Sequence, residues 1–179
     1  MRIIGGTHKG RRIAPPPRLP VRPTTDLAKE SLFNILNNLI DFEDLRVLDL
    51  FAGTGSISFE FASRQAAVVD SVDVNFKCLE FVRATAKELH LDNIRTFRAD
   101  VFKFLKRPPA QPYDLIFSDA PFGLEQVVGL PEIIYGQGWL KKDAWLIIEH
   151  PRSVDFTRQQ YFDQQRNYGK VNFSFFRQT

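Results

Sequence analysis

The sequence predicts an α/β fold in which a mostly parallel, seven-stranded sheet carries helices on both faces. From residue 46 onward, short apolar runs alternate with stretches of helical periodicity, which is typical of a parallel sheet. Near the end, two strand-like runs flank Gly169 and predict an antiparallel hairpin. The first 24 residues contain five prolines and three glycines, which favours an extended arm over a long helix or a central strand.

Length and composition favour one domain behind this arm. The chain has 179 residues, of which 44% are hydrophobic, enough for a single sizeable core. We therefore expect an arm over residues 1–24 and one folded domain over residues 25–179. A single cysteine excludes an internal disulfide and a cysteine-based zinc module. No membrane-length apolar run or secretory signal is visible, so we expect a soluble, cytoplasmic protein.

Positive charge is concentrated at the start of the chain. Residues 1–30 carry seven Lys or Arg against two Asp or Glu, a net charge of +5, whereas the rest of the chain carries −2. This distribution suits an arm that binds phosphate, although a solubilising basic tail would look the same. The charged residues that we expect to contact nucleic acid are Lys9, Arg11, Arg12 and Arg22.

The regular elements follow in order along the chain. A helix is expected after Pro23, because Thr24, Thr25 or Asp26 can cap it and apolar residues then recur at helical spacing up to Leu39. The predicted strands span residues 47–51, 68–74, 94–97, 113–118, 144–149, 164–168 and 170–176. The predicted helices span residues 56–64, 76–89 and about 101–105, with a further helical stretch after residue 124.

A glycine loop joins the first predicted strand to its helix. Its glycines, Gly53 and Gly55, permit a tight turn and close approach of a ligand to the backbone, and the following helix offers free N–H groups. Asp73 lies twenty residues after Gly53, at the end of the next strand, where a carboxylate can accept both hydroxyls of a ribose. Ser58 stands where a dinucleotide fingerprint would have a third Gly or Ala.

Asp49, just before the loop, decides which nucleotide fits. Its carboxylate would repel a pyrophosphate but would suit the cationic tail of S-adenosylmethionine. After the third strand, Asp100 can bind the adenine amino group while Val101 packs near the ring. Asp49 could instead be a buried structural acid, and Asp100 a helix N-cap. The expected cofactor-binding residues are Asp49, Phe51, Ala52, Gly53, Thr54, Gly55, Asp73, Val74, Asp100 and Val101.

After the fourth strand the chain reads Asp119-Ala120-Pro121-Phe122, which resembles the turn of amino-directed S-adenosylmethionine methyltransferases. In those proteins an Asp or Asn is followed by two prolines and a Phe or Tyr, so Ala120 departs from the pattern. Pro121 still favours extended backbone at Ala120, whose carbonyl is retained. Phe122 could alternatively be a core residue at an ordinary turn.

Motifs along the whole chain resemble the bacterial RsmD family. They are Arg2-Ile3-Ile4-Gly5-Gly6, Lys9-Gly10-Arg11-Arg12, Arg22-Pro23-Thr24-Thr25-Asp26, Glu30-Ser31-Leu32-Phe33-Asn34 and the stretch from Asp49 to Gly55. The resemblance implies a Rossmann-like class I methyltransferase that transfers a methyl group from S-adenosylmethionine to the N2 amine of one guanine in small-subunit (16S) ribosomal RNA. The implied catalytic residues are Asp119, Ala120, Pro121 and Phe122, and the implied substrate is the RNA or the assembled 30S particle.

Two alternatives remain at this point. The same turn also serves adenine-N6 methylation of DNA or RNA, although the chain lacks room for a DNA target-recognition domain. A chain that kept the fold without transfer would be an RNA-binding assembly factor.

Other residues narrow the chemistry. Cys78 lies in an apolar-periodic helix and is expected to be inert packing rather than a nucleophile. His8, His90 and His150 lack ligand spacing, so no metal is expected; His8 could touch phosphate, and the other two are expected in surface or loop positions. We expect a monomer that does not bind membranes.

Overall fold

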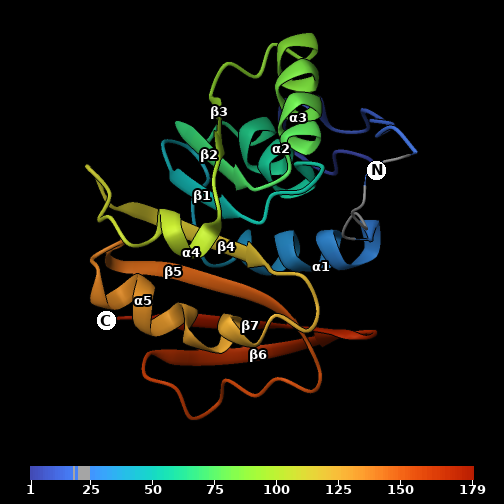
Figure 1. Cartoon of the computed structure of the whole chain (residues 1–179). Coiled ribbons are helices and arrows are strands. Elements are labelled where there is room, and N and C mark those ends of the chain that lie inside the picture. The colour runs from blue at the N-terminus through green and yellow to red at the C-terminus, as the bar shows by residue number, and fades with distance from the viewer. Residues whose placement is uncertain (18, 20–24) are drawn as a thin grey trace.

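The computed structural model describes residues 1–17, 19 and 25–179, and these form one seven-stranded sheet (Figure 1). The strand order is β3-β2-β1-β4-β5-β7-β6. The first five strands in this order are parallel, β7 is antiparallel to β5, and β6 is antiparallel to β7. The strands are β1 (Arg46–Leu50), β2 (Val68–Asp73), β3 (Ile94–Arg98), β4 (Tyr113–Asp119), β5 (Leu140–Pro151), β6 (Phe162–Tyr168) and β7 (Val171–Arg177).

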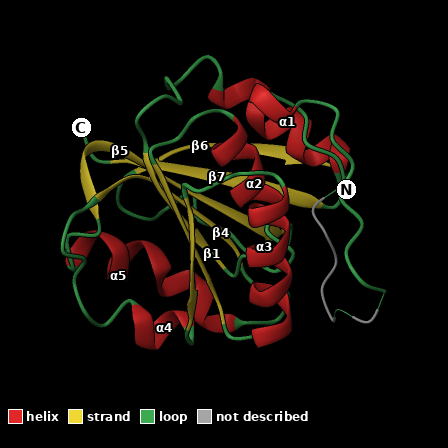
Figure 2. Ribbon diagram, turned by 90° about the horizontal axis from the view of Figure 1, so that it is seen from above, coloured by secondary structure: helices red, strands yellow, loops and turns green. Residues whose placement is uncertain are grey.

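Helices cover both faces of the sheet, as seen from above in Figure 2. One hydrophobic cluster joins α1, α2 and α3 to one face, and a second joins α4 and α5 to the other. Because the central strands are buried on both faces, the sheet separates two hydrophobic cores. The helices are α1 (Asp26–Leu36), α2 (Ser56–Ser63), α3 (Phe76–Glu88), α4 (Val101–Phe104) and α5 (Leu130–Gly136), with 3-10 turns η1 (Gly6–His8) and η2 (Glu125–Gly129).

The predicted α/β fold, with its mostly parallel sheet and closing hairpin, is confirmed. Two boundaries differ from the prediction by three residues or more. Thr25 caps α1, but the helix ends at Leu36, so Leu39 lies outside it and is partly exposed. Strand β5 begins at Leu140 rather than at residue 144, and its register against β4 shifts between Tyr113 and Leu115. The charged residues at the start of β5 are exposed, so the apolar run in the sequence did not reveal this part of the strand.

The first thirteen residues fold back on themselves rather than extending freely. Arg2 and Arg12 form an antiparallel bridge, and the amide of Ile3 donates to the carbonyl of Arg11 at 2.9 Å. Ile3 and Ile13 are buried in the core beneath α1 and α2. This burial offsets the entropy of ordering the segment. Residues 18 and 20–24, including Arg22, lie outside the described part of the chain.

Gly6 shows how closely this arm packs on α2. Its φ is +75°, and a Cβ atom there would lie 1.9 Å from the carbonyl oxygen of Ser63. Only glycine fits this position. The amide of His8 then donates to Ser63 Oγ at 3.0 Å, and the His8 ring contacts the carbonyl of Leu89 at 2.8 Å.

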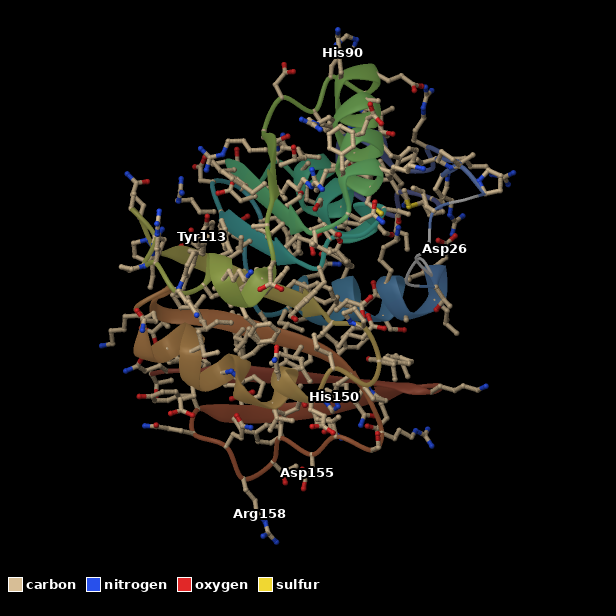
Figure 3. The ribbon with its side chains drawn as sticks, in the orientation of Figure 1. Asp26, His90, Tyr113, His150, Asp155 and Arg158 are labelled. Atoms are coloured by element: carbon tan, nitrogen blue, oxygen red, sulfur yellow. The ribbon has the colours of Figure 1, made fainter. Side chains whose placement is uncertain are left out.

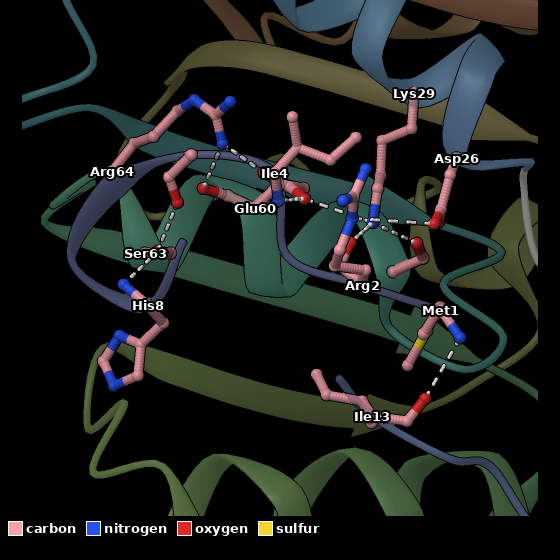
Figure 4. Close-up of polar contacts among 12 residues, drawn as sticks. Met1, Arg2, Ile4, His8, Ile13, Asp26, Lys29, Glu60, Ser63 and Arg64 are labelled. Atoms are coloured by element: carbon pink, nitrogen blue, oxygen red, sulfur yellow. Dashed lines mark hydrogen bonds and ion pairs between the residues drawn. The ribbon is translucent and has the colours of Figure 1, made fainter. Parts of the chain in front are cut away.

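A buried ionic cluster fastens the arm to α1 and α2 (Figure 4). Lys29 Nζ lies 3.1 Å from Glu60 Oε1 and donates to the carbonyl of Arg2. Glu60 also accepts from the amide of Ile4 at 2.6 Å and pairs with Arg64. Lys29 and Glu60 are 1% and 0% exposed, so these charges are separated from water and depend on one another.

Candidate active site

The candidate site lies at the carboxyl ends of the parallel strands. Strand order reverses between β1 and β4, since β2 and β3 lie on one side of β1 and β5 lies beyond β4. In open α/β sheets such a reversal leaves a crevice at the carboxyl edge, where ligands bind. The glycine loop follows β1 and the Asp119 turn follows β4, so the two motifs meet at this point.

Positive φ angles shape the glycine loop between β1 and α2. Gly55 has a φ of +75°, and a Cβ atom there would lie 2.7 Å from Val82 Cγ2 on α3. Phe51 and Gly53 also have positive φ, and the amide of Gly53 donates to Asp73 Oδ2 at 2.8 Å. The Gly53–Asp73 bond ties the glycine loop to the end of β2. Glycine at position 55 leaves the space next to Val82 free of a side chain.

Asp49 is a buried carboxylate among other carboxylates. It is 2% exposed and accepts a 2.5 Å hydrogen bond from Ser58, which also contacts Ser71 at 2.7 Å. Burial raises the pKa of Asp49 to about 7; the Ser58 bond opposes this, and the negative charges of Asp119 and Asp73 add to it. The carboxylates of β1, β2 and β4 therefore lie close enough to interact.

Asp73 and Asp100 already have partners in the chain. Asp73 Oδ1 accepts from the amide of Asn75 at 2.7 Å, in addition to the Gly53 bond. Each carboxylate oxygen has two acceptor sites, which leaves room for further donors. Asp100 Oδ1 caps α4 by accepting from the amide of Lys103 at 2.9 Å, so its predicted alternative role as an N-cap is confirmed. Its contact with adenine stays a prediction.

The remaining loop residues surround these acids at one edge. Thr54 is buried, Phe51 and Ala52 are half-buried, and Val101 is buried at the start of α4. Val74, directly after Asp73, is 66% exposed, which leaves its side chain available to a flat ring. The ten predicted cofactor-binding residues therefore come together at the ends of β1, β2 and β3.

The turn after β4 presents an aromatic ring to solvent. Ala120 is buried, Pro121 is exposed, and Phe122 is 62% exposed. The alternative that Phe122 is a core residue is wrong, because an exposed ring contributes little to the core. Asp119 is half-buried beside it. The turn thus combines hydrogen-bond acceptors with a stacking surface.

Glu149 belongs to this edge, although sequence reasoning missed it. Glu149 on β5 lies directly opposite Asp119 on β4 in the strand register, and its side chain is 6% exposed. Burial, and secondarily the charge of Asp119, raise the pKa of Glu149 to about 8. Its Oε2 atom is buried without a hydrogen-bond partner among the described residues. An acid directly after the apolar run of residues 144–148 was the available signal.

The charge of this edge fits a cationic ligand. Within the described residues, Asp49, Asp73 and Glu149 form no ion pair with Lys or Arg. A positive group would offset the repulsion between Asp49 and Asp73 and favour the ionised form of Asp49. The sulfonium and ammonium groups of S-adenosylmethionine match this requirement, whereas a pyrophosphate would add negative charge.

Of the predicted RNA-binding residues, Arg11 lies apart from the carboxyl edge, and Arg22 is outside the described part of the chain. Lys9, Arg11 and Arg12 are exposed, and Arg11 Nη2 lies 3.2 Å from Glu88 Oε1 at the end of α3. Because α3 has 13 residues, its two ends are about 18 Å apart. The Arg11 side chain therefore lies at the end of α3 that is remote from Asp73.

The burial of the cysteine matches the prediction, whereas that of the histidines matches only in part. Cys78 is fully buried, as predicted, and burial raises the pKa of its thiol. His90 and His150 lie far apart in Figure 3. The prediction of a surface or loop position was wrong for His150, which is 1% exposed in β5 and contacts Ser174 Oγ at 2.8 Å. Among the described residues, no group of three or more potential ligands could hold a metal ion, and no helix could cross a membrane.

The sheet order, the acid and glycine loop after β1, the acid ending β2 and the acidic turn after β4 together define the class: the fold and site are those of an S-adenosylmethionine-dependent methyltransferase. The model of the family described as "Conserved hypothetical protein 95" matches residues 1–177. The chain belongs to this family.

Named relatives agree with this class. The chain is 33% identical to Ribosomal RNA small subunit methyltransferase D of Buchnera aphidicola, over 84% of this chain and 78% of the relative. It is also 33% identical to the protein of that name from Escherichia coli, over 83% and 74% of the two chains. The structure of a hypothetical protein of Thermus thermophilus superposes with a TM-score of 0.85 at 21% identity, covering 99% of each chain, which shows the shared fold.

Proposed function

We propose that this protein transfers a methyl group from S-adenosylmethionine to the N2 amine of a specific guanine in small-subunit ribosomal RNA. One observation carries the proposal: at the strand-order reversal, the acid-flanked glycine loop adjoins a half-buried Asp119 and an exposed Phe122. The relatives named as small-subunit ribosomal RNA methyltransferases support the substrate class.

The cofactor would be held by the carboxyl ends of three strands. Asp73 would accept the ribose hydroxyls, Val74 and Val101 would flank the adenine, and Asp100 would bind its amino group through the oxygen that does not cap α4. Asp49 and the glycine loop, from Phe51 to Gly55, would hold the amino-acid end. When bound, the sulfonium supplies an already activated methyl group.

The turn after β4 would prepare the nucleophile. An exocyclic guanine amine is a poor nucleophile because its lone pair is delocalised into the ring. The Asp119 carboxylate and the Ala120 carbonyl accept the two N–H groups and thereby direct the lone pair out of the ring plane. Phe122 stacks on the base, a contact worth about 1–3 kcal/mol, while Pro121 restricts the backbone of Ala120. Alignment of the reacting atoms can supply roughly 7–11 kcal/mol.

Residues 1–24 would act as the RNA-binding part of the chain and residues 25–179 as the catalytic part. The exposed Lys9, Arg11 and Arg12 would contact RNA phosphates. Arg22 is assigned the same role from sequence. The target guanine would leave its stack to reach Phe122, as bases do for enzymes that act on them.

Mass spectrometry of ribosomal RNA tests this proposal. RNA from a strain that lacks the protein should have lost one N2-methylguanine, and supplying the gene again should restore it. An unchanged set of modified nucleosides would refute the proposal. Methyl incorporation by the purified protein into small-subunit particles, with duplex DNA as a parallel substrate, separates guanine-N2 transfer from adenine-N6 transfer.

A further inference from the structure

A cationic and aromatic surface lies where α3 begins. Phe76 is the first residue of α3 and is 46% exposed. Arg83 lies on the same helix, and Arg98 ends β3. The guanidinium carbon of each arginine is 5.7 Å from the centre of the Phe76 ring, within cation–π range. We call these three residues the α3 rim.

The positive charge of the α3 rim is not neutralised by neighbouring acids. In the described part of the chain, neither Arg83 nor Arg98 forms an ion pair with a carboxylate. Arg95, on the same edge strand as Arg98, shows the contrast, because it binds both oxygens of Asp70 at 2.6 Å. Both arginines of the α3 rim are exposed, so their charges are available to an external anion.

The combination of groups favours nucleic acid as the partner. An exposed ring gives a base a stacking surface, and arginine binds phosphate and also stacks. A protein partner that docked through apolar contacts would require a wider patch than one ring between two cations. The α3 rim therefore has the chemistry of a binding site for an unpaired nucleotide.

The position of the α3 rim connects it to the active site. Asp73 precedes Phe76 by three residues, and Asp100 follows Arg98 by two, so the rim borders the predicted adenosine end of the site. The arm contacts the opposite end of α3 through the Arg11–Glu88 ion pair. Figure 3 marks that remote end by His90. RNA that reached both surfaces would run along α3, where Lys77 and Lys87 are also exposed.

We propose that the α3 rim is a second RNA-contacting surface, on which an unpaired base stacks on Phe76 and phosphate binds Arg83 and Arg98. The inference rests on the proposed function, because the partner is the same ribosomal RNA that carries the target guanine. The α3 rim adds affinity and fixes the direction of the RNA, while methyl transfer takes place at Asp119.

Binding and turnover of substituted proteins test the α3 rim. The ligands are an unmodified small-subunit ribosomal RNA transcript and small-subunit particles from a strain lacking the protein. Phe76→Ala should weaken RNA binding roughly 5- to 150-fold, the range of one lost stack, and raise KM without a matching loss of kcat. Phe76→Trp should retain binding, whereas Phe76→Leu, which keeps apolar bulk for folding, should not. The double variant Arg83→Gln, Arg98→Gln should lower the salt dependence of binding by about one to two units of log–log slope.

Arg177→Gln is the matched control, because Arg177 is on β7, on the far side of the sheet from β3, and its guanidinium carbon lies 5.1 Å from the centre of the Trp145 ring. It should bind RNA like the original protein. RNA binding by Phe76→Ala within twofold of the original protein would overturn the proposal. A loss of S-adenosylmethionine affinity without a loss of RNA affinity would overturn it too, by placing the ring in the cofactor site. Loss of particle binding with unchanged transcript binding would point to a ribosomal protein and overturn the RNA assignment. If the original protein binds the RNA but does not methylate it, the proposed function fails and the α3 rim is still tested by binding.

Discussion

At the scale of single residues, Asp119 is the carboxylate on which the proposed transfer depends. Replacing it by Ala removes the acceptor that would direct the amine lone pair. We expect Asp119→Ala to slow methyl transfer by about 2–4 kcal/mol, the scale of other single polar contacts in transition states. Single-turnover methyl incorporation into small-subunit particles measures this. Asp163→Ala, at an exposed position on the edge strand, is the control, and a normal rate for Asp119→Ala would remove Asp119 from the mechanism.

Glu149 makes folding depend on pH. Its pKa is about 8 in the folded protein against an ordinary value of 4.5, so folding takes up a proton between these values. The stability that protonated Glu149 allows is complete below about pH 4.5 and is lost as pH rises toward 8, by about 1.4 kcal/mol per pH unit at most. Glu149→Gln cannot ionise. We expect its advantage in free energy of unfolding over the original protein to grow between pH 5.5 and 8.5.

Urea unfolding of the cofactor-free protein at those two pH values measures the difference. Glu43→Gln makes the same substitution at an exposed glutamate and should show no such growth. Asp49 is present in all three proteins, so its own titration cancels in the comparison. Equal pH dependence of the original protein and Glu149→Gln would contradict the raised pKa.

At the scale of elements, the glycine loop joins backbone geometry to cofactor binding. Gly55→Ala combines a left-handed backbone with a Cβ atom 2.7 Å from Val82. We expect it to cost about 1–3 kcal/mol of stability and to weaken S-adenosylmethionine binding, because α2 would have to shift away from α3. Gly138→Ala has a similar φ of +68° but open space around its Cβ. It should lose only the smaller backbone contribution and bind the cofactor normally, as thermal unfolding and calorimetry can show.

The ionic cluster between α1 and α2 holds the arm in place. Lys29→Gln leaves Glu60 buried with less compensating charge, for which we expect a loss of roughly 3–5 kcal/mol in unfolding free energy. Lys141→Gln breaks the exposed pair with Asp114 and should cost about 1 kcal/mol or less. Chemical denaturation compares the two. Equal costs would show that burial of the cluster adds nothing.

At the scale of the whole molecule, the exposed charges of the arm are expected to bind RNA without taking part in methyl transfer. The double variant Lys9→Gln, Arg12→Gln removes two exposed charges of the arm. We expect the log–log salt dependence of RNA affinity to fall by about one to two units, while transfer at saturating RNA is kept. The double variant Lys106→Gln, Arg107→Gln removes two exposed charges after α4 and is the control. The same fall in both double variants would show that RNA affinity depends on the net charge of the protein and not on the arm.

Periodicity predicted most of the fold, because strand and helix positions repeat with different periods. The glycine loop, Asp73 and the Asp119 turn were visible for the same reason, since each follows a strand. The folded-back arm was not, because the contacts that hold it, such as Ile4 to Glu60, are 56 residues apart. Glu149 was missed because its partner, Asp119, is adjacent only once β4 and β5 pair.

The buried position of the single cysteine has a practical consequence for labelling this protein with a fluorophore. Cys78 is fully buried, and its thiol is harder to ionise than usual, so it should react slowly with maleimide dyes. A new cysteine on the surface can therefore carry a fluorophore without removal of the native one. A change in the emission of a dye placed on the arm would report the binding of ribosomal RNA.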